Sequence, residues 1–183
     1  VNKCIEIAQD DSIKYRDREK AIIDYIRKEQ MYLVEEFKVD EIFMTEDNKT
    51  IWDYCDTLNS LNVVTEKWPK ILRQLEELEY SENDIVKFEE YLGDREKEYE
   101  NILVYFLYKH IMYGTNDGNV FQRVRFAIIA TRIIFMVGLM KYIENEEFTT
   151  EDNIKVAYIF SKEIEHDDEN IDTILEDISL GMI

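Results

Sequence analysis

The stretch EYENILVYFLYKHIMYGTNDGNVFQRVRF, from Glu98 to Phe126, decides the fold of this chain. Its first half is apolar almost all round between Ile102 and Tyr108, which is typical of a helix buried on every side. The run from Gly114 to Gly118 is a dense turn signal. We therefore predict two long helices, residues 95–112 and 119–144, packed antiparallel as a hairpin at the centre of the protein.

Helical periodicity continues on both sides of this hairpin. One Pro and five Gly leave little for β-turns, so the predicted fold is all-α, an irregular bundle of about seven to nine helices in one domain, residues 1–183. The polar segment 37–48 is predicted to be a loop. The other predicted helices are 2–9, 15–28, 31–37, 50–58, 66–78, 82–91, one starting at Thr149 or Thr150, and a last one starting at Asp167 or Asp168.

Several helix ends carry a local signal. Ser81 and Asp84 have the spacing of a capping box at the start of the 82–91 helix. Thr65 can cap the 66–78 helix, where Pro69 is tolerated only because it falls near the first turn. Gly93 is placed to end the 82–91 helix.

The net charge of −19, with a pI near 4.5, bounds the possible partners. Such a surface repels phosphate backbones, so no nucleic-acid partner is expected. It serves solubility or attracts lysine-bearing substrates, and composition leaves both interpretations open. Cys4 and Cys55 are the only cysteines, which argues against a disulfide framework or a structural zinc site. With no signal-peptide pattern, a cytoplasmic location is predicted.

Residues 127–140 are apolar enough to raise the question of a membrane span. Arg132 lies in their middle, between Arg125 and Lys141. A central arginine costs about 2.5 to 3.5 kcal/mol in a bilayer, and the uninterrupted run is far shorter than the ~20 residues needed. We therefore predict a core helix and no membrane partner.

The segment Glu163–His166 contains the spacing E-x-x-H, which places a carboxylate and an imidazole one helical turn apart, as in di-iron bundles. A complete site of that kind needs a second copy of the motif. The other histidine, His110, has Leu107 three residues before it. No metal site is therefore predicted.

Arginines on the second long helix precede a strongly acidic segment. Arg125 and Arg132 are seven residues apart and share one helix face. We expect at least one of them to pair with Glu163, Glu165 or Glu169 in a packed ion network; an anion site, for example for a cofactor carboxylate, is the alternative. The candidate functional cluster comprises Arg123, Arg125, Arg132, Glu163, Glu165, His166, Glu169 and Asn170.

Four sequence elements resemble the C-terminal part of the flagellin lysine-N-methylase family. They are YENILVYF from Tyr99, the acidic and glycine-containing turn, RVRFA from Arg123, and the box EIEHDDEN of Glu163–Asn170. Weaker similarity extends to residues 4–10 and 52–55. Asp167 stands where a serine is common in the family, and the family's cysteine-rich region has no counterpart here.

The resemblance implies a bacterial protein-lysine N-methyltransferase that acts on flagellin or another lysine-bearing protein. It also implies S-adenosylmethionine as methyl donor and a cysteine-bound metal or iron–sulfur centre, both outside this segment. No glycine-rich loop or other catalytic motif is present, so catalytic residues stay unassigned and the segment alone is expected to be inactive. A non-enzymatic interaction module or a degenerate relative is the alternative. The box also has a structural interpretation, with Asp167 or Asp168 capping the last helix and His166 close to the C-terminus of the preceding one.

Overall fold

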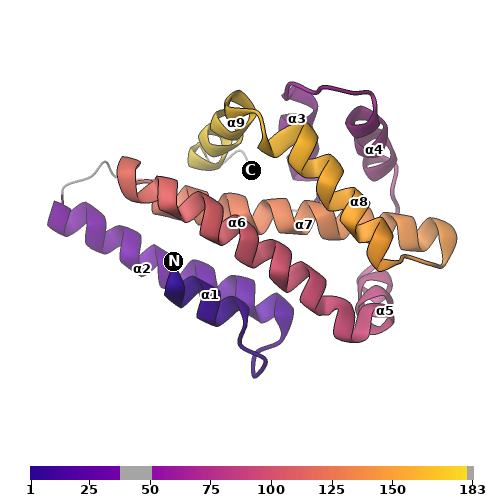
Figure 1. Cartoon of the computed structure of the whole chain (residues 1–183), viewed down its shortest axis with the longest axis horizontal. Coiled ribbons are helices and arrows are strands. Elements are labelled where there is room, and N and C mark those ends of the chain that lie inside the picture. The colour runs from indigo at the N-terminus through magenta and orange to yellow at the C-terminus, as the bar shows by residue number, and fades with distance from the viewer. Residues whose placement is uncertain (38–50, 181–183) are drawn as a thin grey trace.

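The computed structural model describes residues 1–37 and 51–180, and in these two ranges it contains helices and no strands. The all-α prediction is confirmed (Figure 1). The predicted loop lies outside the described residues except for Phe37, which ends a helix. In chain order the elements are α1 Asn2–Ala8, α2 Tyr15–Phe37, α3 Ile51–Ser60, α4 Lys67–Glu76, α5 Glu82–Leu92, the 3-10 turn η1 Gly93–Arg95, α6 Glu96–Asp117, α7 Val120–Asn145, α8 Thr150–Phe160, the π-helical turn η2 Ser161–Glu165 and α9 Asp168–Ser179.

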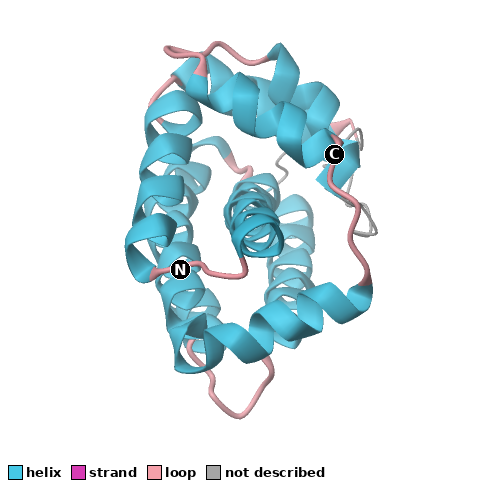
Figure 2. Cartoon of the chain, turned by 90° about the vertical axis from the view of Figure 1, so that its right-hand side faces the viewer, coloured by secondary structure: helices cyan, strands magenta, loops and turns pink. Residues whose placement is uncertain are grey.

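The predicted hairpin is formed by α6 and α7, and α7 is the central helix. Figure 2, viewed from the right-hand side of Figure 1, shows α7 nearly end-on with other helices around it. By length and composition α7 resembles a membrane span, yet most of it is buried by the rest of the protein. Its apolar character is therefore accounted for by its position in the core.

The reversal between α6 and α7 is shorter than the predicted turn. The α-helix continues through Gly114 to Asp117, and the chain reverses at Gly118, where φ is 73°. A Cβ at Gly114 would lie 3.1 Å from the Cα of Val120. Gly114 lies within α6, and its lack of a side chain allows α6 and α7 to approach closely. Local turn propensity cannot distinguish a glycine with this role from a glycine in a turn.

The single helix α2 replaces the two predicted helices 15–28 and 31–37. Neither Gly nor Pro interrupts it, and Gln30 at the expected break is fully buried. The Gln30 amide donates to the Gly118 carbonyl at 3.0 Å, and its oxygen accepts from the Phe121 amide at 3.2 Å. This side chain thus fastens α2 to the hairpin turn and satisfies a free N–H at the start of α7.

The predicted caps form except at α4, whose N-cap is Glu66 rather than Thr65 and has no side-chain cap hydrogen bond. The Asp84 carboxylate accepts from the backbone and hydroxyl of Ser81 at 2.9 and 2.6 Å. The Thr65 hydroxyl oxygen accepts from the Lys67 amide at 3.2 Å, and Gly93 ends α5. Thr149 caps α8 in a capping box with Asp152, and Asp167 caps α9 by accepting from the Glu169 amide at 2.9 Å.

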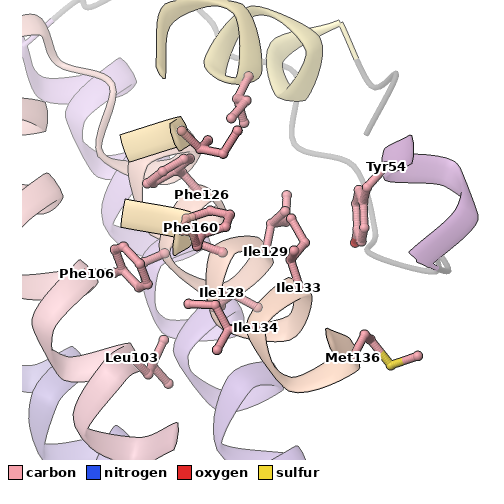
Figure 3. Packing of buried hydrophobic residues seen from close by; sticks show 14 of the residues in the cluster. Tyr54, Leu103, Phe106, Phe126, Ile128, Ile129, Ile133, Ile134, Met136 and Phe160 are labelled. Carbon is pink, nitrogen blue, oxygen red and sulfur yellow. The ribbon is translucent and has the colours of Figure 1, made fainter. Parts of the chain in front are cut away.

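Aromatic rings from α6, α7 and α8 meet in the core (Figure 3). The Phe106 ring lies edge-on to Phe126 and Phe160, with centroids 6.1 and 5.9 Å away. Edge-to-face pairs of this kind add to the free energy of burial. They fix α8 alongside the hairpin and so determine where the segment after α8 emerges.

Gly138, in the middle of α7, is a test of this packing. A Cβ there would lie 2.6 Å from the Tyr99 hydroxyl and 3.1 Å from the Phe148 ring. We expect Gly138→Ala to lower the free energy of unfolding by about 1 to 2 kcal/mol, because overpacking outweighs the gain of about 1 kcal/mol in helix propensity. Thermal and urea unfolding measure the change.

Tyr99→Phe provides the matched background for Gly138→Ala. The Tyr99 hydroxyl is buried and has no hydrogen-bond partner among the described residues, so its removal should be nearly neutral. In that background Gly138→Ala should cost less than in the wild type. Stabilisation by Gly138→Ala in the wild type would contradict the packing described for α7.

Candidate functional site

An open cleft with a volume of about 510 Å³ lies where the C-terminal half of α6 and the start of α7 face η2 and α9. It brings together Arg123, Glu165 and His166 from the candidate cluster. We call it the α6–α9 cleft. It is lined by Lys109, His110, Tyr113, Arg123, Glu165, His166, Asp168, Ile171 and Asp172.

Glu165 forms the floor of the cleft, and its side chain is 0% exposed. One carboxylate oxygen lies 2.8 Å from Lys109 Nζ and 3.3 Å from His110 Nε2. The other oxygen accepts from the Ser161 hydroxyl at 2.6 Å and from the Tyr105 hydroxyl at 3.4 Å. Burial alone would raise the pKa of Glu165, but these donors outweigh burial and lower the pKa to about 2.

The π-helical turn places His166 next to this carboxylate. The His166 amide donates to the Ser161 carbonyl at 3.0 Å, the i to i+5 hydrogen bond of a π turn. Nδ1 of His166 lies 2.8 Å from the same carbonyl oxygen. Because a carbonyl only accepts, Nδ1 carries a proton, and in the neutral ring Nε2 is left with its lone pair.

The two walls of the cleft differ in charge. The α9 wall carries Asp168 and Asp172, four residues apart on one helix face and both exposed. No hydrogen bond or ion pair joins either carboxylate to another described residue. On the opposite wall, the Arg123 guanidinium lies 5.7 Å from the centre of the Tyr113 ring, and Lys109 is paired with Glu165. The exposed Asp168 and Asp172 therefore give the α9 wall its negative charge.

The rest of the box ties the connection between α3 and α4 to the C-terminal segment. Glu163 accepts from the amides of Val64 and Thr65 at 2.8 and 2.9 Å, and from the Thr65 hydroxyl at 2.7 Å. Asn170 accepts from the Asn62 amide at 2.8 Å and donates to the Asn62 carbonyl at 2.7 Å. Glu163 and Asn170 are buried, so this part of the box is structural.

A family model described as FliB lysine N-methylase C-terminal domain matches residues 2–179. The chain belongs to this family. No curated protein and no solved structure matches it. The match covers both walls of the α6–α9 cleft and the whole box. In this FliB-type domain the box has two parts. Glu163 and Asn170 hold a loop, while Glu165 and His166 line a cleft.

The predicted arginine–glutamate pairing is wrong for Arg132. Its Nε donates to Glu19 of α2 at 2.7 Å, beside a separate cavity of about 260 Å³. The predicted glutamate partners bind other groups, and Glu169 accepts from the Asn62 side chain at 3.1 Å. Arg125 is 1% exposed, on the face of α7 that enters the core. The prediction failed because α2, distant in sequence, reaches Arg132 before the box does.

The candidate cluster left out the partners of Glu165, which are Tyr105, Lys109, His110 and Ser161, and the cleft carboxylates Asp168 and Asp172. The signal available was the polar pair Lys109–His110 within the otherwise apolar stretch of α6, since a buried helix carries such a pair only where partners exist. His110 was weighed only as a metal ligand. Its partner Glu165 lies 55 residues away in the sequence.

The cysteine-bound centre that the family implies does not fit the residues described here. Within residues 1–37 and 51–180, no three His, Cys, Asp or Glu side chains are grouped to hold a metal ion. Cys4 and Cys55 are both buried free thiols. Burial raises the pKa of Cys4, and it raises the pKa of Cys55 to about 11, whereas a metal ligand must be a thiolate.

Proposed function

We propose that this domain is the C-terminal helical part of a protein-lysine N-methylase acting on flagellin, and that the α6–α9 cleft receives the target lysine. The family match over residues 2–179 is the observation that carries the proposal. The cleft is open enough for a protein segment to enter, and the net charge of −19 favours encounter with lysine-bearing chains.

The exposed carboxylates of Asp168 and Asp172 would hold the ammonium group of the target lysine. Each is exposed on the cleft wall and has no ion pair to a described residue. Glu165 is less suited to this task because Lys109 and His110 already compensate it. The ammonium would thus lie at the α9 wall, next to His166.

The methyl donor, S-adenosylmethionine, and the metal centre would be held by a part of the protein outside this domain. The cleft offers Ile171 and Tyr113 as its apolar lining, whereas a site for an adenosine group is predominantly apolar. When bound, the donor supplies the methyl group. The residues of the α6–α9 cleft bind and orient the lysine that accepts it.

We expect the domain alone to transfer no methyl groups to flagellin. The measurement is incubation with flagellin and S-adenosylmethionine carrying a labelled methyl group, followed by counting of labelled lysine. The longer protein that contains this domain is the positive control. Labelling by the isolated domain would contradict the placement of the donor outside it.

The double variant Asp168→Asn, Asp172→Asn tests the substrate side of the proposal. It should weaken binding of flagellin by about tenfold, because two charges facing the ammonium are lost. Glu176→Gln, an exposed charge change on α9 away from the cleft, is the matched control. Flagellin binding that is unaffected by the double variant would remove the cleft from the proposal, and binding without methylation in the longer protein would favour a docking module.

A further inference from the structure

We infer that His166 takes the proton from the ammonium group of the target lysine. The inference rests on the proposed function and assigns a step to one residue of the same cleft. A lysine ammonium has no lone pair and cannot accept a methyl group. In the step, the N–H bond of the ammonium breaks, its electron pair stays on the lysine nitrogen, and the proton forms a new bond to Nε2 of His166.

The backbone fixes which ring nitrogen can take this proton. The Ser161 carbonyl accepts two hydrogen bonds from His166. One comes from Nδ1 of the ring at 2.8 Å, and the other comes from the His166 backbone amide at 3.0 Å. The ring is therefore anchored on one side by the π turn. Nε2 is the nitrogen left to act as a base, on an exposed side chain that lines the cleft.

The charged groups around His166 favour this role. The charged and titratable groups are Glu165 and Asp167 from its own segment, Asp168 and Asp172 from α9, Lys109, His110 and Tyr113 from α6, and Arg123 from α7. The carboxylates bring the ammonium to the ring and stabilise the imidazolium that forms. Glu165 is itself held by the Ser161 hydroxyl, so Ser161 supports both the ring and this carboxylate.

Between about pH 5.5 and 8 histidine is the side chain in this group that ordinarily changes its charge. A protonated ring repels an ammonium. Binding of a lysine should therefore weaken as the pH falls through the window, and the dependence should be smaller when His166 is replaced, since His110, the other histidine of the cleft, is common to both proteins.

His166→Asn is the informative variant, because its amide can still donate to the Ser161 carbonyl while it has no basic nitrogen at the position of Nε2. The probes are a flagellin peptide with one lysine and the same peptide with acetyl-lysine. Their affinities for the wild type and for His166→Asn are measured by calorimetry at about pH 8 and about pH 5.5. Thermal unfolding checks that the variant folds.

We expect the lysine peptide to bind the wild type about fivefold more weakly at the lower pH, and to bind His166→Asn with a clearly smaller difference between the two. The 15N signal of Nε2 should move with the lysine peptide and not with the acetyl-lysine peptide. In the longer protein His166→Asn should lower kcat about 100-fold with KM nearly unchanged, and added imidazole should restore part of the rate. A purely structural histidine would show neither the pH effect nor the rescue.

Two failures are distinguishable. If the wild type binds both peptides equally, or neither, the cleft does not recognise an ammonium and the proposed function fails. If the lysine peptide is preferred but His166→Asn keeps the same pH dependence and kcat, the cleft stands and the proton is taken by another group.

Discussion

Glu165→Ala should lower the free energy of unfolding by about 2 to 4 kcal/mol, because it leaves Lys109 and His110 without their buried partner. The replaced carboxylate accepts four hydrogen bonds or ion contacts from α6 and η2. Lys109 is 34% exposed, so water compensates part of its charge, which places the loss below that of a fully buried pair. Urea unfolding measures the change.

Two variants control this experiment. Glu165→Gln keeps the volume and one acceptor oxygen, so it should cost less than Glu165→Ala. Glu176→Ala, on the exposed face of α9, should change stability by less than about 0.5 kcal/mol. If Glu165→Ala is as mild as Glu176→Ala, the carboxylate network does not hold η2 against α6.

Acid should destabilise the domain in a pH window that Glu165 determines. Its pKa is lowered from the usual 4.5 to about 2 in the folded protein. The unfolded state therefore binds the proton first, and the stability that Glu165 contributes is fully present above about pH 4.5 and lost as the pH falls to about 2. The loss from this one group is roughly 3 kcal/mol.

Chemical unfolding at a series of pH values tests this expectation against Glu165→Gln. The variant has no carboxyl group to protonate at this position, so its stability should fall less steeply over the same window. The other carboxylates with lowered pKa, such as Glu163, are common to both proteins and cancel in the comparison. Parallel curves of unfolding free energy against pH for the two proteins would mean that protonation of Glu165 does not contribute to the loss of stability in acid.

The sequence was most informative where local physics decides the structure. The hairpin of α6 and α7 follows from apolar residues on every face and one reversal, and the caps at Ser81 and Thr149 follow from side chains that reach only their own helix. The merging of two predicted helices into α2 depended on Gln30 and its contacts with the hairpin turn. That contact is made across 88 residues of sequence and has no local signature.

The candidate site was predicted only in part for the same reason. The box was identified, and Glu165 and His166 do line the α6–α9 cleft. Which cations face which carboxylates depended on the packing of helices distant in sequence, so Arg132 pairs with Glu19 and Glu165 with Lys109. Charge patterns indicated that ion pairs exist without identifying the members of each pair.

The π turn determines how this site responds to a change in the length of its segment. Lys162 is exposed within η2, and replacing it by alanine should be nearly silent. Deleting it should also be mild, because a π turn holds one residue more than an α-helical turn. The shortened segment can close as α-helix, with the His166 amide on the same Ser161 carbonyl, now four residues before it, so the residues that follow keep nearly the same orientation. Among relatives of this domain, a single-residue gap here would therefore be compatible with an intact cleft, whereas replacement of Glu165 or His166 would not.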